Sequence, residues 1–239
     1  MPLLELRNVS KSFGSLKVAD AATFDLAEGE ALGIIGPNGA GKSTLFNLIA
    51  GNLFPDGGTI RFAGQDVTRT VPMARCLAGI GRTFQIPQPF ETLTVFENLL
   101  VAASFGSRAR EAEAVDRCAR ILIETGLADR ANWPAGRLGL LQRKRLELAR
   151  ALATDPKVLL LDEIAGGLTE AEGRALVDTI RRIHRRGVSI VWIEHVLHAL
   201  NAVVGRLLVL NFGRVFGVGD PQTIMASRDV REIYLGIEI

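Results

Sequence analysis

Nine consecutive residues near the start of the chain have the composition and spacing of a phosphate-binding loop. Four residues separate two glycines, and a lysine and two hydroxyl side chains follow: Gly36, Pro37, Asn38, Gly39, Ala40, Gly41, Lys42, Ser43 and Thr44. Glycines let the backbone curl so that several N–H groups point at one anion, and the N-terminus of a following helix adds positive potential. The motif predicts that Lys42 reaches the β- and γ-phosphates of a nucleoside triphosphate and that Ser43 binds Mg²⁺.

The segments that flank this loop have the pattern that the loop requires. Residues 31–35 are short and uniformly apolar, as a strand buried in a parallel sheet should be. Residues 44–50 have the apolar spacing of a helix, which is expected to end at Gly51. A chance glycine turn before a helix is the alternative, but strand, loop and helix in this order predict a site for a nucleoside triphosphate.

Two further apolar segments end in residues that can act on a bound triphosphate. Residues 158–161 predict a buried strand that ends at Asp162 and Glu163. Asp162 is expected to hold Mg²⁺ opposite the serine of the loop, and Glu163 to act on the attacking water as a general base. Residues 189–193 predict a strand followed by His195, which is expected near the γ-phosphate. Side chains that simply meet solvent at a sheet edge are the alternative for all three.

The rest of the pattern predicts one α/β domain interrupted by a helical insert. Between residues 94 and 153 the apolar spacing is helical and no convincing strand occurs. Outside this segment we expect three strands before the glycine loop, a helix over residues 170–186, and strands over residues 59–62, 79–84, 158–161, 189–193, 206–210 and 214–218. The expected fold is therefore a single domain, residues 1–239. Residues 1–85 and 155–239 form its P-loop α/β core with an N-terminal antiparallel β subdomain, and residues 86–154 form a helical subdomain.

The composition narrows the classes of protein that this chain can represent. Hydrophobic residues make up 48% of the 239 residues, which indicates a parallel sheet buried on both faces or an exposed apolar patch that docks on a partner. The formal charge of +2 gives no general surface for nucleic acid. No apolar run is long enough to span a membrane, and no secretory signal occurs. Cys76 and Cys118 have no metal-binding spacing and suit a reducing compartment, so the chain is expected in the cytosol.

Together these features resemble the ATP-binding subunit of an ABC transporter over nearly the full length of the chain. The glycine loop, Gln85, the strand that ends in two carboxylates, and His195 fall in that family's order and spacing. The resemblance implies that Gln85 contacts Mg²⁺ and water and links hydrolysis to the membrane subunit. It also implies that Phe13 stacks on adenine, with Val18 beside it. For Phe13, a core aromatic is the alternative.

The resemblance also implies a mechanism, partners and a location. Water attacks the γ-phosphate of ATP in line while Lys42, Mg²⁺ and the loop amides stabilise the charge, Glu163 polarises the water, and His195 and Gln85 hold the geometry. The implied partners are a second ABC ATPase subunit, transmembrane permease subunits that dock near Gln85 and residues 87–90, and, indirectly, a periplasmic binding protein. The implied location is the cytoplasmic face of the inner membrane, as a peripheral subunit.

Several segments look like one branch of this family, the importers of branched-chain amino acids. These segments are residues 81–90, 93–99 and 162–169 and the terminal motif of residues 233–236. The region around Gln85 looks more like the ATPase subunit usually designated G than the one designated F. Urea-type importers are near relatives and remain an alternative.

One segment departs from the family pattern. The family opens a helix of its helical subdomain with Leu-Ser-Gly-Gly-Gln, which caps the ATP bound to the opposite subunit, whereas residues 138–142 read Leu-Gly-Leu-Leu-Gln. Gly139 removes the hydroxyl, and Leu141 places a bulky side chain where the backbone approaches phosphate. We favour an asymmetric pair in which one composite site hydrolyses poorly, since a lost charge-assisted donor costs about 1.5–3 kcal/mol. The alternative is that neighbouring residues restore the contact and both sites work.

Two other classes of function compete with a transporter subunit. One is a soluble ABC ATPase that acts on nucleic acid or ribosomes, and the other is a nucleotide-dependent regulator that does not hydrolyse. The single ATPase unit, the lack of a heptad run and the near-neutral charge argue against the first class. An intact Glu163 argues against the second.

Overall fold

Six strands form the sheet that carries the glycine loop in the computed structural model, which describes residues 1–107 and 110–235. The strands lie in the order β10-β9-β3-β8-β7-β6, and every neighbouring pair is parallel except β10 with β9. Their bounds are β3 (Ala31–Ile35), β6 (Ile80–Arg82), β7 (Val158–Asp162), β8 (Ser189–Ile193), β9 (Arg206–Asn211) and β10 (Arg214–Gly219). The predicted parallel sheet and its terminal hairpin are therefore confirmed.

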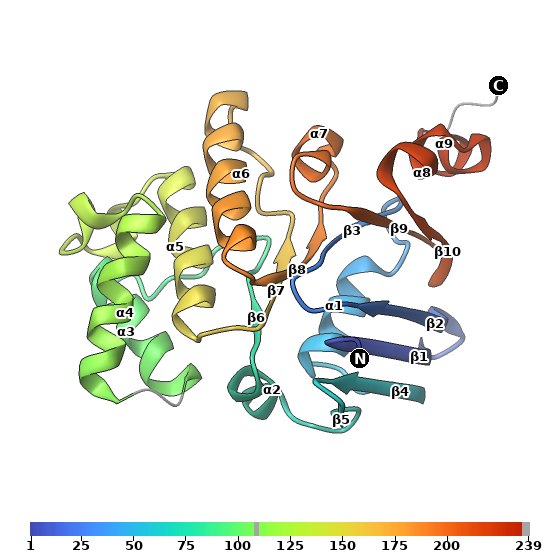
Figure 1. Cartoon of the computed structure of the whole chain (residues 1–239), viewed down its shortest axis with the longest axis horizontal. Helices are drawn as coiled ribbons and strands as arrows, with labels where there is room; N and C mark the ends of the chain where they lie inside the picture. Colours follow the sequence, from blue (N-terminus) through green and yellow to red (C-terminus); the bar gives the residue numbers. More distant parts are fainter. Residues whose placement is uncertain (108–109, 236–239) are drawn as a thin grey trace.

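A second, antiparallel sheet comes from the N-terminal part of the chain and lies at the lower right of Figure 1. Its order is β2-β1-β4-β5, with bounds β1 (Leu4–Phe13), β2 (Leu16–Leu26), β4 (Gly57–Phe62) and β5 (Gln65–Asp66). β1 and β2 are longer than the short strands that the sequence pattern predicts. Register shifts interrupt their pairing after Leu6, and such irregularities break the strict alternation on which a strand prediction depends.

Three helices form a separate group at one end of the molecule (left in Figure 1), and the other helices lie against the sheets. This group consists of α3 (Val95–Gly106), α4 (Glu111–Glu124) and α5 (Leu140–Ala153), with the 3-10 turns η1 (Ala128–Arg130) and η2 (Ala135–Arg137) before α5. α3 begins at a capping box, because the Thr94 hydroxyl accepts from the backbone N–H of Glu97 and the Glu97 carboxylate accepts from that of Thr94. In the described part of residues 94–153 every regular element is a helix or a 3-10 turn, as predicted.

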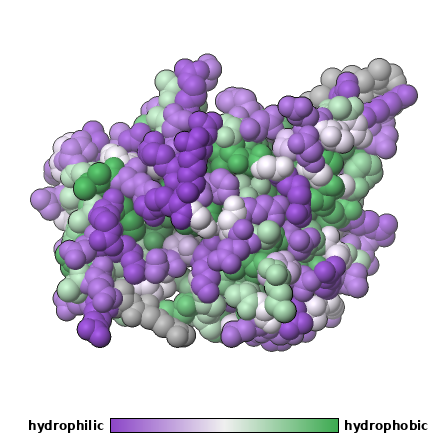
Figure 2. Space-filling view, viewed as in Figure 1, coloured by the Kyte–Doolittle hydropathy of each residue, from purple (hydrophilic) through white to green (hydrophobic). Residues whose placement is uncertain are grey.

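Four of the remaining helices connect strands of the core, and two follow the last strand, β10. They are α1 (Lys42–Ala50), α2 (Pro72–Ala78), α6 (Glu170–Arg185), α7 (Leu197–Asn201), α8 (Pro221–Ala226) and α9 (Arg228–Leu235). The sequence pattern predicts α1 and α6 but misses the others, since two turns or fewer give too little apolar periodicity to recognise. The outer face of α6 is a hydrophilic column in Figure 2. Within the described ranges no helix is long and apolar enough to cross a bilayer.

Two hydrophobic cores lie against opposite faces of the parallel sheet. One joins the sheet to α3, α4, α5 and α6, and the other fills the space between the sheet, α1 and the antiparallel sheet. Alternate residues of β3 point into each core, with Ile35 in the first and Ile34 in the second. β3, β7 and β8 are buried at every position, so burial on both faces accounts for much of the high apolar content. The subdomain boundaries at residues 85 and 155 stay a prediction, and Gly236 of the terminal motif lies outside the described residues.

Candidate nucleotide-binding and hydrolysis site

The glycine loop follows β3 and packs tightly against two other strands. Gly36 and Gly41 have φ angles of 158° and 99°, which residues with a side chain rarely adopt. A Cβ at Gly36 would lie 2.1 Å from the carbonyl oxygen of Leu210, and one at Gly41 would lie 2.3 Å from that of Val18. These two positions therefore require glycine for both conformation and space. Gly41 is also the N-cap of α1, so the helix N-terminus opens directly onto the loop.

A cavity of about 330 Å³ lies over this loop. Residues from the loop, from β2 and from the end of β7 line it, namely Leu16, Val18, Asn38, Gly39, Ala40, Gly41, Lys42, Ser43, Thr44 and Glu163. The Lys42 ammonium is 7% exposed and donates to the carbonyl oxygens of Gly36 (2.7 Å) and Pro37 (3.0 Å). Burial lowers its pKa, and the nearby carboxylates of Glu163 and Asp162 oppose that shift. A buried cation beside a cavity lined by a helix N-terminus is suited to an anionic ligand.

The order of the strands explains how distant parts of the chain reach this cavity. β8 lies between β3 and β7, and Asp162 of β7 is in register with Ile193 of β8. Because these strands are parallel, the loop after β3, the carboxylates at the end of β7 and His195 after β8 meet at the same edge of the sheet. Gln85 follows β6, the next strand along. The sequence predicted each of these strand ends, and the topology brings them together.

Glu163 is the centre of a hydrogen-bonded trio. Gln85 Nε2 donates to Glu163 Oε2 (2.5 Å), and His195 Nε2 lies 2.8 Å from Glu163 Oε1, a hydrogen bond in which the imidazole N–H donates because a carboxylate only accepts. Glu163 adopts a left-handed backbone conformation (φ 44°), which costs about 1–2 kcal/mol for a residue with a Cβ. Its N–H donates to the carbonyl oxygen of Ile193 (2.9 Å), which holds this conformation. Such strain is typical of functional positions.

Asp162 makes a contact that the sequence did not predict. Its Oδ2 lies 3.2 Å from Nη2 of Arg82, whose Nη1 donates to Asn47 of α1 (2.6 Å). Burial raises the pKa of Asp162, and the guanidinium of Arg82 opposes that shift. Arg82 was missed because its side chain becomes a neighbour of Asp162 only once β6 pairs with β7. Asp162 does not line the cavity itself and lies one residue before Glu163, which does.

The two predicted adenine contacts lie on the N-terminal strands β1 and β2. Val18 lines the cavity together with Leu16, a residue that the sequence did not single out although it belongs to the same strand. Phe13 ends β1 outside the cavity lining, with its side chain 51% exposed and the Lys11 ammonium 5.8 Å from the centre of its ring. The alternative that Phe13 is a core aromatic is therefore wrong. Its stacking role stays a prediction.

The divergent segment lies at the start of α5. Gly139 is the N-cap of this helix and has no side-chain capping bond, as the loss of a hydroxyl requires. Leu140 follows with 48% of its surface exposed, and Leu141 is half-buried. The helix N-terminus is retained, but it presents leucine side chains where the family pattern has small residues.

Glu194 is a buried carboxylate between β8 and His195. It is 1% exposed, and its Oε1 accepts from the backbone N–H of Ala165 (3.2 Å). Burial raises its pKa to about 7, and the charge of Glu163 adds to this shift while Lys144 opposes it. A carboxyl group whose pKa is raised on folding destabilises the folded chain once it ionises. The free energy of unfolding therefore falls as pH rises from the unfolded pKa, near 4.5, to about 7, and the full loss of stability is present above pH 7.

Replacing Glu194 by Gln should therefore stabilise the chain at high pH. We expect the free energy of unfolding to rise by an amount on the order of 1–3 kcal/mol at pH 8 and by well under half of that at pH 5, because the amide mimics the protonated acid. Urea unfolding followed by circular dichroism at both pH values measures this. Glu28→Gln, at an exposed carboxylate in the turn before β3, is the control. A gain for Glu194→Gln that is the same at both pH values would contradict the prediction.

The comparisons with known proteins identify the family of this chain. Residues 19–166 match the family model described as ABC transporter. The chain is 35% identical to the high-affinity branched-chain amino acid transport ATP-binding protein LivG of Escherichia coli, over 98% of each chain. A crystal structure of a nucleotide-free ATP-binding cassette from an ABC transporter matches with a TM-score of 0.90 and 31% identity, over 99% of this chain and all of that one.

A further match concerns a cassette that has bound nucleotide. The dimeric structure of a post-hydrolysis state of an ATP-binding cassette, bound to ADP and Pi, has a TM-score of 0.81 and 25% identity over 91% of this chain and 98% of that one. The family model matches more than half of the chain, and the matches in sequence and fold extend over nearly all of it. The chain therefore belongs to the ABC transporter family, as one of its ATP-binding cassettes.

Proposed function

We propose that this chain hydrolyses ATP to power an importer of branched-chain amino acids, as a peripheral subunit on the cytoplasmic face of the inner membrane. One observation carries the hydrolytic part of the proposal. Glu163 lines the cavity over the glycine loop and accepts hydrogen bonds from both Gln85 and His195. The cargo and the location rest on the similarity to LivG and on the segments that look like this branch.

In the proposed mechanism a water molecule attacks the γ-phosphate of ATP in line with the leaving oxygen. Lys42 leaves its two carbonyl partners to bind the β- and γ-phosphates, and the loop amides stabilise the charge that develops there. Glu163 polarises the water and accepts its proton as a general base. Gln85 and His195 hold the Glu163 carboxylate in place, so that the water is positioned by a group that cannot rotate freely.

The donor set at the end of β7 suits Mg²⁺. The proposed ligands Ser43, Gln85 and Asp162 offer a hydroxyl, an amide and a carboxylate oxygen, and Mg²⁺ prefers oxygen ligands and usually shares them with substrate phosphates and water. When bound, the ion neutralises charge on the phosphates. Arg82 contacts Oδ2 of Asp162, so a metal ion held by this carboxylate would share it with the guanidinium.

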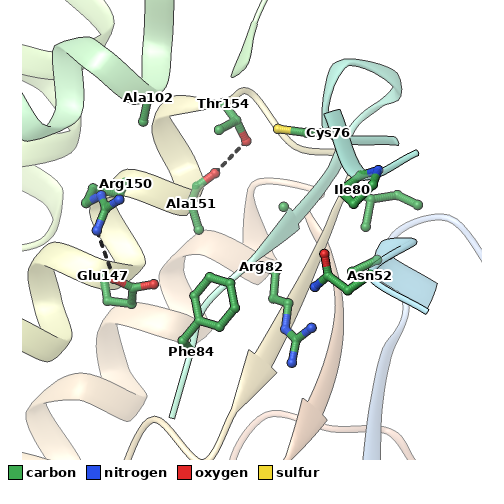
Figure 3. Close-up of a pocket in the computed structure, with 13 residues that line it drawn as sticks. Asn52, Cys76, Ile80, Arg82, Phe84, Ala102, Glu147, Arg150, Ala151 and Thr154 are labelled. Carbon is green, nitrogen blue, oxygen red and sulfur yellow. Dashed lines mark hydrogen bonds and ion pairs between the residues drawn. The ribbon is translucent and has the colours of Figure 1, made fainter. Parts of the chain in front are cut away.

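The proposed docking site for the permease is a second cavity, of about 230 Å³, between α2, β6 and α5. Figure 3 shows Arg82 and Phe84 at this cavity, with Glu147 and Arg150 of α5 facing them. Phe84 is 49% exposed. Ile86 and Phe90, which follow along the chain, are also exposed, so this face offers apolar side chains for a segment of a membrane subunit. Gln85 lies between this face and Glu163, which supports a link between docking and hydrolysis.

Transport assays test the cargo. We expect cells in which Glu163→Gln replaces the native residue to lose uptake of radiolabelled leucine, with uptake of urea unchanged. Loss of urea uptake with normal leucine uptake would assign the chain to the urea-type alternative. Normal uptake of both, together with a purified chain that hydrolyses ATP, would favour an ABC ATPase without a membrane partner.

The segment at residues 138–142 predicts a low activity for the chain on its own. We propose a heterodimer in which this segment contacts the nucleotide of the second subunit, so an isolated chain can pair only with its own weakened segment. Its turnover per site should be at least about 10-fold below that of the reconstituted pair, since one charge-assisted donor contributes about 1.5–3 kcal/mol. Measured ATPase rates of the two preparations test this.

A variant that restores the family pattern is the matched control for this prediction. Gly139→Ser combined with Leu140→Gly and Leu141→Gly should raise the turnover of the isolated chain toward that of the pair. An isolated chain that is already as fast as the pair would rule out the asymmetric arrangement and leave the alternative that both composite sites work.

A further inference from the structure

Lys144 is a buried lysine for which the mechanism above has no role. It lies on α5, two residues after the segment 138–142, and is 4% exposed. Its ammonium donates to the backbone carbonyl oxygens of Glu163 (3.3 Å) and Gln85 (3.5 Å). Burial lowers its pKa, and the charges of Glu194 and Glu163 oppose that shift. An ammonium group from the helical group therefore contacts the backbones of Gln85 and Glu163.

The neighbouring cations of α5 show that this placement is specific. Arg143 donates to the carbonyl oxygens of Leu138 and Gly136, and the nearest carbonyl partner of Arg145 is Gly126, so both contact their own helical group. Lys144 alone of these three consecutive cations reaches across to the strand ends of the core. Burying an ammonium group costs several kcal/mol. The packing of α5 does not by itself require a lysine here, because an apolar side chain would fill the same space.

The two carbonyl groups that Lys144 contacts belong to the residues whose side chains bond each other. Gln85 Nε2 donates to Glu163 Oε2, and Lys144 Nζ bridges the backbones of the same pair. The ammonium thus adds to the contacts that join the loop after β6 to the end of β7. Thr83 Oγ1 accepts from the backbone N–H of Asp162 (3.2 Å), and beyond it Gln85 is held against Glu163 by their side-chain hydrogen bond and by Lys144. A side-chain hydrogen bond contributes about 1 kcal/mol.

We propose that Lys144 is a positioning residue for hydrolysis, which holds the backbones of Gln85 and Glu163 so that the Glu163 carboxylate is aligned on the attacking water. This proposal rests on the proposed role of Glu163. It has a consequence for the pair of subunits. α5 begins with the segment that contacts the partner's nucleotide, and the same helix carries Lys144, so a shift of α5 alters the alignment of this chain's own Glu163. Occupancy of the opposite site then changes the rate at this one.

Kinetics of Lys144→Met in the reconstituted pair test the proposal. We expect kcat to fall by about 10- to 100-fold, the loss typical of a catalytic group misplaced by about 1 Å, while KM and the affinity for ATP change by less than about threefold. Lys144→Arg, which keeps a cation at the same place, should recover part of the rate. Arg145→Met, the adjacent cation whose partner lies in the helical group, should leave kcat unchanged.

A double variant separates positioning from a general structural role. If Lys144 acts through Glu163, adding Lys144→Met to Glu163→Gln should lower kcat no further than Glu163→Gln alone. A further loss of kcat by the same factor as in Lys144→Met alone would overturn the proposal in favour of a structural role. A fall in the Tm of Lys144→Met large enough to account for its lost activity would do the same. So would a kcat within twofold of the unmodified pair. Failure of the unmodified pair to hydrolyse ATP would instead reject the proposed function.

Discussion

Replacing Glu163 by Gln is expected to reduce ATP turnover by about 10²- to 10⁴-fold, the contribution typical of a general base, while ATP still binds. The amide cannot take a proton from water. The carboxylate accepts from Gln85 on one oxygen and from His195 on the other, and an amide in the same place has an NH₂ group at one of these two positions, so one of the two hydrogen bonds is lost. The glycine loop and Lys42 are untouched, so binding of the triphosphate should persist. Steady-state phosphate release and equilibrium binding of a fluorescent ATP analogue measure the two quantities.

The matched control is the same substitution at a surface carboxylate. Glu170, in the first turn of α6, has a side chain that is 74% exposed and pairs only with Arg174 four residues on. Glu170→Gln should hydrolyse ATP at the normal rate. Normal turnover in Glu163→Gln would remove Glu163 from the mechanism, and loss of ATP binding in the same variant would show that its effect is on binding and not on the chemical step.

Local patterns in the sequence predicted the elements that bring the site together. A short apolar strand, a loop whose glycines are required by space and conformation, and an amphipathic helix are each properties of fewer than ten consecutive residues. The capping boxes at Thr94 and Thr169, which begin α3 and α6, are equally local, but they were not predicted. The short helices α2 and α7 were missed because their seven and five residues complete too little of the helical period to be recognised.

The buried charges around the site could not be predicted in this way. Lys144 stands between two arginines, and nothing in the local pattern distinguishes it from Arg143 or Arg145. Glu194 was read only as part of the strand that precedes His195. Arg82 and Asp162 are 80 residues apart and become neighbours only through the pairing of β6 with β7. Which polar side chains are buried, and against which partners, is decided by the order of the strands in the sheet.

The family resemblance filled part of that gap. It indicated Gln85 and His195, whose local signals were weak, and the structure places both against Glu163. It also implied a role for Phe13, which lies outside the lining of the cavity. Resemblance gives residues that a whole family shares, and for that reason it gave no indication of Lys144. Such contacts have to be read from the packing of this chain.

Replacing Lys42 by Met is expected to weaken ATP binding by about 100-fold or more, because in the proposed mechanism the ammonium binds two phosphates and a hydrogen bond to a charged group contributes about 1.5–3 kcal/mol. A ligand at 100 times its dissociation constant stabilises the folded chain by about 2.7 kcal/mol, so saturating ATP should raise the Tm of the unmodified chain clearly and that of Lys42→Met hardly at all. Without nucleotide the two should unfold at similar temperatures, since the variant loses two hydrogen bonds to carbonyl groups but also a buried charge.

The control for Lys42→Met is Lys157→Met, at an exposed lysine just before β7 on the far end of the same sheet. This variant should keep the full rise in Tm with ATP, because the ends of parallel strands that bind ligands are the carboxyl ends and Lys157 precedes an amino end. If Lys42→Met retained the ATP-induced shift, the triphosphate would have to bind without the one buried cation among the residues that line the cavity. The loop amides alone would then hold the nucleotide, and the proposal that Lys42 exchanges its carbonyl partners for phosphates would be wrong.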